Sequence, residues 1–267
     1  MKIDISMEFF ATAGNIATHI EDSKVGDKAV LLLHGYLETM YVWEDMFREL
    51  SRDYRVIRID LPGHGLTCSS PINTIEMMAT VAKGVLDVCG VKTAAVIGHS
   101  LGGFVAVKCC QLFPDRFEKM VLLNSHPYGE NPERVALSVR EQAIIEDGRL
   151  MQLAELSIPK MFHPSNLRRL DEQIREITEL CETHDPAGIV SSLKGMVQRT
   201  DSGEFLASTD IPALAICGET DNLATAEIRE KMRQQCPRLR LEVLPECCHN
   251  VFLEKPERTL ELLREFL

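Results

Sequence analysis

The sequence predicts an α/β fold, in which a mostly parallel β-sheet is flanked by helices and interrupted by an inserted helical segment. Short apolar runs alternate along the chain with segments of helical periodicity, a pattern typical of parallel sheets whose strands are joined by helices. The alternation stops between about 127 and 206, where helical segments with interspersed Met and Leu follow one another without a good strand. The third observation is the pentapeptide Gly98-His99-Ser100-Leu101-Gly102, which stands between an apolar run and a helix-compatible stretch.

The strands are predicted from their apolar runs. Ile3–Phe10 and Ile16–Ile20 flank Ala13-Gly14-Asn15, a turn signal, and so predict an opening hairpin. Ala29–Leu33 is an unbroken apolar run, as expected of a central strand that is buried on both faces. The remaining predicted strands repeat this theme, and they are Tyr54–Ile59, Thr93–Ile97, Met120–Leu123, Ala213–Cys217 and Leu241–Leu244.

Amphipathic segments between these strands predict the helices. Outside the inserted segment the predicted helices are Val42–Leu50, Ile75–Val88, Gly102–Leu112, Ala226–Gln235 and Pro256–Leu267. Inside the inserted segment they are Pro132–Ile145, Arg149–Leu156, Asn166–Thr183 and Pro186–Val197. We interpret residues 127–206 as a helical cap, or lid, inserted into a core that is formed by residues 1–126 and 207–267.

Composition narrows the class of protein and its partners. With 267 residues, 45% of them hydrophobic and 26% charged, the chain is expected to be globular. The formal net charge of −11 argues against nucleic acid and anionic membranes as partners. No stretch approaches transmembrane length and no secretory signal opens the chain, so we expect no membrane insertion. The nine cysteines are odd in number and contain no C-x-x-C pair, which favours a reducing cytoplasm and gives little support to a zinc or redox site.

Ser100 is the candidate nucleophile. A serine between a buried strand and a helix requires a sharp turn, and the neighbouring glycines relieve the crowding of that turn because they lack Cβ. Such a turn would hold the Ser100 Oγ at the carboxyl end of the sheet. A G-x-S-x-G pattern in this strand–turn–helix context is typical of a nucleophile elbow.

A serine hydroxyl is a weak nucleophile that needs an adjacent base, and the base needs an orienting acid. The candidate base is His249, which follows the last predicted strand and precedes the C-terminal helix. The candidate acid is Asp221, which follows the predicted strand Ala213–Cys217. Asp221 could instead stabilise a turn or cap a helix, and the two roles are compatible. Asn124 is the rival position for the acid, but an amide supplies no charge.

Two backbone N–H groups are predicted to form an oxyanion hole. One is that of Leu101, immediately after the nucleophile, and the other is that of Tyr36, in the loop His34-Gly35-Tyr36. We interpret His34 and His99 as structural, because a histidine at the end of a buried strand more often bonds to loop backbone. A metal site built from His34, His64 and Asp60 matches no ligand spacing that we can justify. The adjacent Cys247 and Cys248 are expected to be packing residues.

With Ser100, Asp221 and His249 in this chain order, the sequence resembles the α/β-hydrolase superfamily, and within it the small capped esterases, enol-lactonases and cofactor-free perhydrolases. The matching pieces are Leu33–Tyr36, Asp60–Gly65, Gly98–Gly103, Gly218–Asp221 and Cys248–His249. The resemblance implies an eight-stranded sheet with a helical lid, an acyl-enzyme mechanism, and no metal or organic cofactor. Many relatives carry a proline shortly after the acid, whereas this chain reads Asn222-Leu223-Ala224-Thr225.

The leading hypothesis is a serine hydrolase that cleaves a carboxylic ester, thioester or lactone of a small, largely apolar acyl substrate. Carbon–carbon bond hydrolysis and perhydrolysis are alternatives, because both can use the same three side chains. A non-catalytic small-molecule receptor on a hydrolase scaffold is the alternative from another class. Met151, Met161, Phe162 and Met196 are candidates to line the acyl pocket or to pack inside the cap. Oligomeric state is not predicted.

Overall fold

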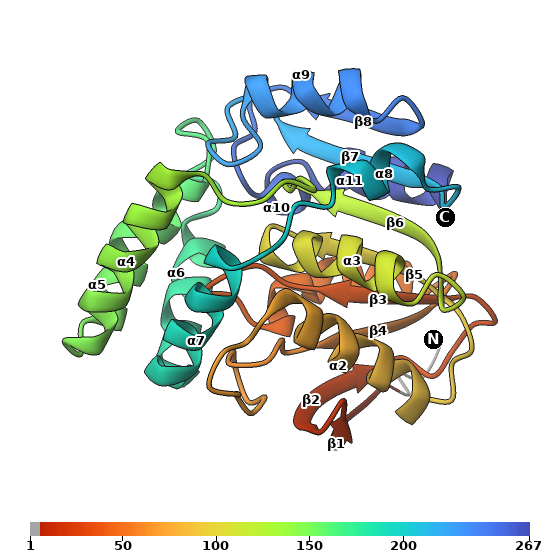
Figure 1. The fold of residues 1–267 in the computed structure, drawn as a ribbon, viewed down its shortest axis with the longest axis horizontal. Coiled ribbons are helices and arrows are strands. Elements are labelled where there is room, and N and C mark those ends of the chain that lie inside the picture. The colour runs from red at the N-terminus through yellow and green to blue at the C-terminus, as the bar shows by residue number, and fades with distance from the viewer. Residues whose placement is uncertain (1–5) are drawn as a thin grey trace.

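An eight-stranded sheet forms the centre of the computed structural model, which describes residues 6–267 (Figure 1). The strand order is β1-β2-β4-β3-β5-β6-β7-β8. β1 pairs with β2 and β2 with β4 in antiparallel fashion, and all the other neighbours are parallel. The strands are β1 Met7–Ala13, β2 Ile16–Asp22, β3 Ala29–Leu33, β4 Arg55–Ile59, β5 Ala94–His99, β6 Phe117–Leu123, β7 Ala213–Gly218 and β8 Leu239–Leu244.

The predicted opening hairpin is confirmed. Gly14 (φ +54°) and Asn15 (φ +69°) both lie in the left-handed region, as a two-residue hairpin turn that matches the twist of its strands requires. Within the described residues β1 begins at Met7, whereas the sequence predicted a strand from Ile3 to Phe10. Residues 3–5 of that prediction lie outside the described residues, and the strand continues to Ala13 because its pairing with β2 extends to the turn.

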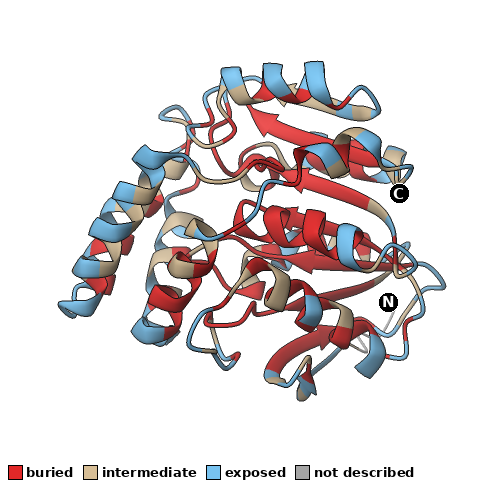
Figure 2. Ribbon diagram, in the orientation of Figure 1, coloured by how far each residue is buried: buried red, intermediate tan, exposed pale blue. Residues whose placement is uncertain are grey.

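Helices cover both faces of the sheet and enclose two apolar clusters. On one face lie α2 (Ile75–Val88), α3 (Leu101–Leu112) and α9 (Ala226–Gln235), and on the other α1 (Glu44–Leu50), α10 (Val251–Glu254) and α11 (Pro256–Phe266). Alternate side chains of β3 enter alternate clusters: Leu31 and Leu33 the first, Val30 and Leu32 the second. The inner strands β3, β5 and β7 are buried along their whole length and are red in Figure 2, whereas the edge strands β1 and β8 are mostly exposed or half-buried. β3 is a central strand as predicted.

The segment between β6 and β7 is helical, and its helices pack around an apolar cluster that includes Leu150, Ile158 and Ile189 together with Leu37 from the loop after β3. In Figure 1 its helices α4 to α7 lie at the side toward which the arrowheads of β6 and β7 point. The elements are α4 Pro132–Glu146, α5 Leu150–Ser157, η2 Ile158–Met161, α6 Asp171–Leu180, η3 Cys181–Thr183 and α7 Pro186–Val197, followed by the short α8 Gly203–Ser208.

One helix boundary in this segment was predicted wrongly. The sequence predicted a helix from Asn166 to Thr183, but α6 begins at Asp171. The Asn166 amide donates hydrogen bonds to the Glu246 carbonyl (2.9 Å) and to Glu254 (2.9 Å) instead of entering a helix. Residues 166–170 form turns before α6, and the Asn166 side chain at their start is bonded to residues distant in the sequence.

Several strands are longer than their apolar runs. β6 begins at Phe117 rather than Met120, and β8 begins at Leu239 rather than Leu241. The additional residues include polar ones, because backbone pairing with a neighbouring strand continues beyond the buried side chains. Over the described residues no helix is both long and apolar enough to cross a membrane. All nine cysteines are free thiols.

Candidate active site

Ser100 lies in a sharp turn between β5 and α3, with φ +49° and ψ −110°. Positive φ is strained for a residue with a side chain, and such strain is concentrated at functional sites. The close packing of the turn leaves no room at its glycines: a Cβ on Gly98 would overlap the Gly102 backbone, one on Gly102 the Leu33 carbonyl, and one on Gly103 the Ser125 side chain. Glycine is therefore required at these positions because neighbouring atoms leave no space for a side chain, and not because the backbone must be flexible there.

Gly102→Ala is expected to destabilise the protein, because its new methyl group meets rigid backbone rather than a movable side chain. Overpacking of this kind costs about 1–3 kcal/mol in unfolding free energy, which denaturant titration measures. The control is Gly129→Ala, whose Cβ would make only ordinary contacts of 3.6 Å or more. Equal unfolding free energies for the two variants would contradict this account of the turn.

The structure brings the three predicted side chains into one hydrogen-bonded chain. His249 Nε2 lies 2.9 Å from Ser100 Oγ, and His249 Nδ1 lies 2.9 Å from Asp221 Oδ1. A carboxylate can only accept, so Nδ1 carries the hydrogen and the Nε2 lone pair faces the Ser100 hydroxyl. Ser100 is 7% exposed and the other two residues 4% each, so the chain is shielded from bulk water.

Asp221 is held by groups besides His249. Its Oδ1 accepts a hydrogen bond from the Leu223 N–H (2.8 Å), and its Oδ2 accepts one from Asn124 Nδ2 (2.8 Å). Burial alone would raise the pKa of this carboxyl, but His249 and these donors outweigh it and lower the pKa. Asp221 is therefore an ionised carboxylate with a fixed orientation.

Asn124 has a role that the sequence did not predict. It was considered only as a rival acid, but it donates to Asp221 and also to the Cys248 carbonyl (2.8 Å), while its Oδ1 accepts from the Val251 N–H (3.1 Å). It thus fastens the acid to the loop that carries His249. Its place directly after the predicted strand Met120–Leu123 is the sequence signal that could have found it, and the structure gives it a φ of +50°.

The two predicted oxyanion donors come from separate segments, since Leu101 is the first residue of α3 and Tyr36 lies in the loop after β3. The Ser100 N–H is bonded to the Leu123 carbonyl (3.0 Å), so the next N–H, that of Leu101 at the start of α3, is the first one available. Across residues 6–267, neither the Leu101 N–H nor the Tyr36 N–H has a protein acceptor. Unpaired backbone donors beside a nucleophile can stabilise an oxyanion.

The loop that carries His249 is fastened to the inserted helical segment. The His249 N–H donates to the carbonyl of Met161 (2.9 Å), the last residue of η2 before α6. Glu254, a buried carboxylate, accepts from the Cys248 N–H (2.7 Å) and from the His163 N–H (2.7 Å). Met161, predicted to line a pocket or pack in the cap, therefore also contacts the site through its backbone. Glu254 was missed because the bond that joins the two segments is to His163, 91 positions away in the sequence.

The other histidines and cysteines near the site have structural surroundings. His34 Nδ1 donates to the Gly35 carbonyl (2.7 Å), and its Nε2 accepts from the Leu61 N–H (2.8 Å), so no lone pair remains for a metal. Within the part of the chain that the structure describes, no three His, Cys, Asp or Glu side chains form a group that could hold a metal ion. Burial raises the pKa of Cys247 to about 12, which suits a packing residue rather than a reactive thiolate.

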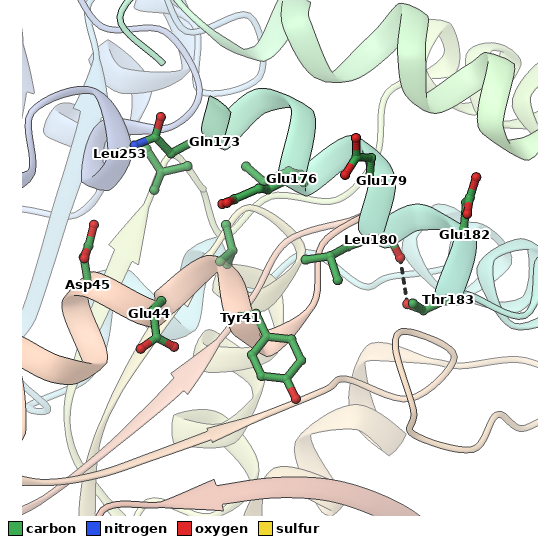
Figure 3. A pocket seen from close by; sticks show the side chains of 12 residues that line it. Tyr41, Glu44, Asp45, Gln173, Glu176, Glu179, Leu180, Glu182, Thr183 and Leu253 are labelled. Atoms are coloured by element: carbon green, nitrogen blue, oxygen red, sulfur yellow. Dashed lines mark hydrogen bonds between the residues drawn. The ribbon is translucent and has the colours of Figure 1, made fainter. Parts of the chain in front are cut away.

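A separate surface pocket of about 610 Å³ lies between α1 and α6 (Figure 3). Carboxylates surround it, among them Glu44, Glu176 and Glu182, while Leu180 and Leu253 supply apolar surface. None of the three residues of the hydrogen-bonded chain lines it. This pocket is therefore distinct from the candidate active site.

Comparison with known proteins agrees with the fold and the geometry. Residues 28–256 match the family model described as the alpha/beta hydrolase fold. The chain belongs to the α/β-hydrolase family. This confirms the predicted fold class, the family resemblance inferred from the sequence motifs, and the assignment of the chain as a hydrolase enzyme.

Relatives within this family carry different activities in their names. A Bacillus subtilis (strain 168) protein, provisionally named 2-succinyl-6-hydroxy-2,4-cyclohexadiene-1-carboxylate synthase, is 30% identical over 254 residues, covering 90% of each chain. A 2-hydroxy-6-oxononadienedioate/2-hydroxy-6-oxononatrienedioate hydrolase from Paraburkholderia phymatum is 27% identical, covering 94% of this chain and 91% of its own. The solved structure of a thermophilic esterase from Thermogutta terrifontis superposes with a TM-score of 0.89 at 27% identity, covering 97% of each chain.

Proposed function

We propose that this α/β-hydrolase is a serine hydrolase that cleaves a carboxylic ester, thioester or lactone of a small, largely apolar substrate through an acyl-enzyme on Ser100. The observation that carries the proposal is the hydrogen-bonded chain from Ser100 Oγ through His249 to the ionised Asp221. Its similarity to a solved esterase supports the substrate class. Neither the proposed chemistry nor the residues assigned to it involve a cofactor.

The proposed mechanism follows from which atom faces which. His249 Nε2 takes the proton of Ser100 as Oγ attacks the substrate carbonyl, and Asp221 stabilises the imidazolium that forms. The N–H groups of Leu101 and Tyr36 donate to the oxyanion of the tetrahedral intermediate. His249 then gives its proton to the leaving group and activates the water that releases the acid.

We further propose that residues 127–206 act as a cap that shapes the acyl pocket, with residues 1–126 and 207–267 as the core. Support comes from the low exposure of Ser100 and from the bond between the His249 N–H and the Met161 carbonyl. The fixed contacts of Glu254 hold one end of this segment against the loop of His249. A cytoplasmic location is inferred from the nine free cysteines.

Carbon–carbon bond hydrolysis is the second candidate. It is favoured by the relative named as a hydrolase of 2-hydroxy-6-oxononadienedioate, a keto acid whose name contains no ester. Perhydrolysis could use the same residues. A non-catalytic receptor would have the same residues and bind its ligand without turnover. Carbon–carbon hydrolysis breaks a different bond and a receptor breaks none, so a substrate panel separates these two from the main proposal.

The panel compares p-nitrophenyl esters of increasing acyl length, an acyl thioester, a γ-lactone and a vinylogous keto acid. We expect turnover of short and medium apolar acyl esters, with an initial burst if deacylation limits the rate. The Ser100→Ala variant is the control for background hydrolysis. Cleavage of the keto acid with negligible ester turnover would favour the second candidate, and tight ligand binding with no turnover of any compound would favour a receptor.

A further inference from the structure

A buried acid–base pair lies between the two loops of the site and takes no part in the mechanism above. His99, next to the nucleophile, and Glu38, just after the oxyanion loop, are 0% and 2% exposed. Glu38 Oε2 lies 2.9 Å from His99 Nδ1, and His99 Nε2 lies 2.7 Å from the His249 carbonyl oxygen. The pair therefore reaches the backbone of the candidate base.

The same carboxylate oxygen holds the oxyanion loop. Glu38 Oε2 accepts a hydrogen bond of 2.6 Å from the Gly35 N–H, one residue before the predicted oxyanion donor Tyr36. The contact is so close that a Cβ on Gly35 would lie 2.7 Å from His99 Nδ1 and 2.8 Å from Glu38 Oε2. A larger residue at position 35 would have to displace the pair, so the loop packs directly against it.

The pair is ionic. Both ring nitrogens of His99 face acceptors, a carboxylate and a carbonyl, so each must carry a hydrogen and the ring is an imidazolium. Burial opposes charge on both groups, yet their attraction keeps the pKa of Glu38 below its usual value and that of His99 above it. The charge of Glu38 is what allows His99 to donate in two directions.

We propose that the buried Glu38–His99 pair is a positioning device, which fixes the oxyanion loop Gly35–Tyr36 relative to the backbone of His249. The inference rests on the proposed function, because it assigns the pair a part in aligning that mechanism. Neither residue touches the reacting atoms. Their effect is exerted through the placement of the Tyr36 N–H and of the His249 ring, which must both meet the same substrate carbonyl.

The test substitutes Glu38→Gln, which keeps the shape and removes the charge. His99 then loses its second proton, and one link breaks in either orientation of the new amide. If the amide oxygen faces Gly35 and His99, the ring has one N–H for two acceptors. If the NH₂ faces them instead, it can donate to His99 Nδ1, but the Gly35 N–H loses its acceptor. We expect kcat per active site to fall about 10- to 100-fold, the range expected for misplaced catalytic groups. KM should change less than about three-fold, because the lost interaction acts in the transition state. Active-site titration corrects both values for any unfolded fraction.

The matched control is Glu21→Gln, which breaks another buried ion pair, that of Glu21 with Arg58 (Nε to Oε2 2.7 Å), with no hydrogen bond to the three candidate catalytic residues. It should lower the melting temperature but leave kcat unchanged. His99→Gln removes the other partner of the pair and replaces Glu38→Gln as the test variant if Glu38→Gln does not fold. The double variant Glu38→Gln/His99→Gln should be no slower than the slower single one, because the pair acts as a unit.

The positioning role is overturned if Glu38→Gln keeps kcat within about two-fold of the unmodified enzyme. It is equally overturned if Glu21→Gln lowers kcat as much, or if KM alone rises. Failure of the proposed function is a different result, because the unmodified enzyme would then show neither ester turnover nor a titratable serine. A turnover-competent enzyme whose Glu38→Gln variant is unimpaired would remove only the positioning role.

Discussion

Ser100→Ala is expected to lower kcat for the best ester on the order of 10⁵- to 10⁶-fold, while the protein stays folded. The reason is that Oγ is the only atom the substitution removes, and it is the atom that His249 Nε2 faces at 2.9 Å. KM should change little if the substrate still docks in the pocket. Stopped-flow and steady-state kinetics on the purified variant measure the loss of activity. Circular dichroism and the melting temperature check that the protein is folded.

The backbone strain at Ser100 makes this result specific. Because Ser100 already holds φ +49°, alanine at the same position meets the same strain and no new clash. A melting temperature close to that of the unmodified enzyme is therefore expected. Full activity in a well-folded Ser100→Ala protein would contradict the mechanism.

Asp221→Asn is expected to lower kcat on the order of 10⁴-fold. Its carboxylate now accepts from three donors: Oδ1 from His249 Nδ1 and the Leu223 N–H, Oδ2 from Asn124 Nδ2. An asparagine must turn its own NH₂ toward one of these donors. Facing His249, it forces the ring hydrogen onto Nε2, so that no lone pair remains to take the Ser100 proton.

The pH–rate profile of Asp221→Asn separates this explanation from simple unfolding. If the tautomer is the cause, activity should recover in part at high pH, where hydroxide competes for the Ser100 proton. The control is Asn124→Ala, which removes one donor to Asp221 but keeps the charge, and should cost less than Asp221→Asn. An equal loss in both variants would show that orientation, and not the charge at position 221, carries the effect.

The fold and the three central side chains could be predicted from local signals. Unbroken apolar runs such as Ala29–Leu33 identify strands buried on both faces, and the structure places this one at the centre of the sheet. The glycines around Ser100 identify the turn because their neighbours leave no room for Cβ. In a parallel sheet the carboxyl ends of strands share one edge, so Asp221 after β7 and His249 after β8 were expected near Ser100.

The rest depends on contacts that no local pattern encodes. Asn124 bonds to Asp221, 97 positions away, and Glu254 to His163, 91 positions away. The place of Asn124 directly after a predicted strand marks it only as a residue at the edge of the sheet, and no local pattern marks Glu254. The start of α6 was misplaced because residues 166–170 form turns, in which Asn166 bonds to the distant Glu254. The sequence analysis did not identify Glu38, because it considered only the loop His34-Gly35-Tyr36 before it. The role of this buried carboxylate depends on its partner His99, 61 positions away in the sequence.

The central claim is that His249 activates Ser100 as a nucleophile. Intact and peptide mass spectrometry after treatment with a fluorophosphonate tests it most directly, with His249→Ala treated alongside. The account predicts a single phosphonyl adduct on the peptide that contains Ser100, and no adduct on the His249→Ala protein at the same exposure. A folded, unmodified enzyme that acquires no adduct, or an adduct on Ser100 that forms equally fast without His249, would contradict it.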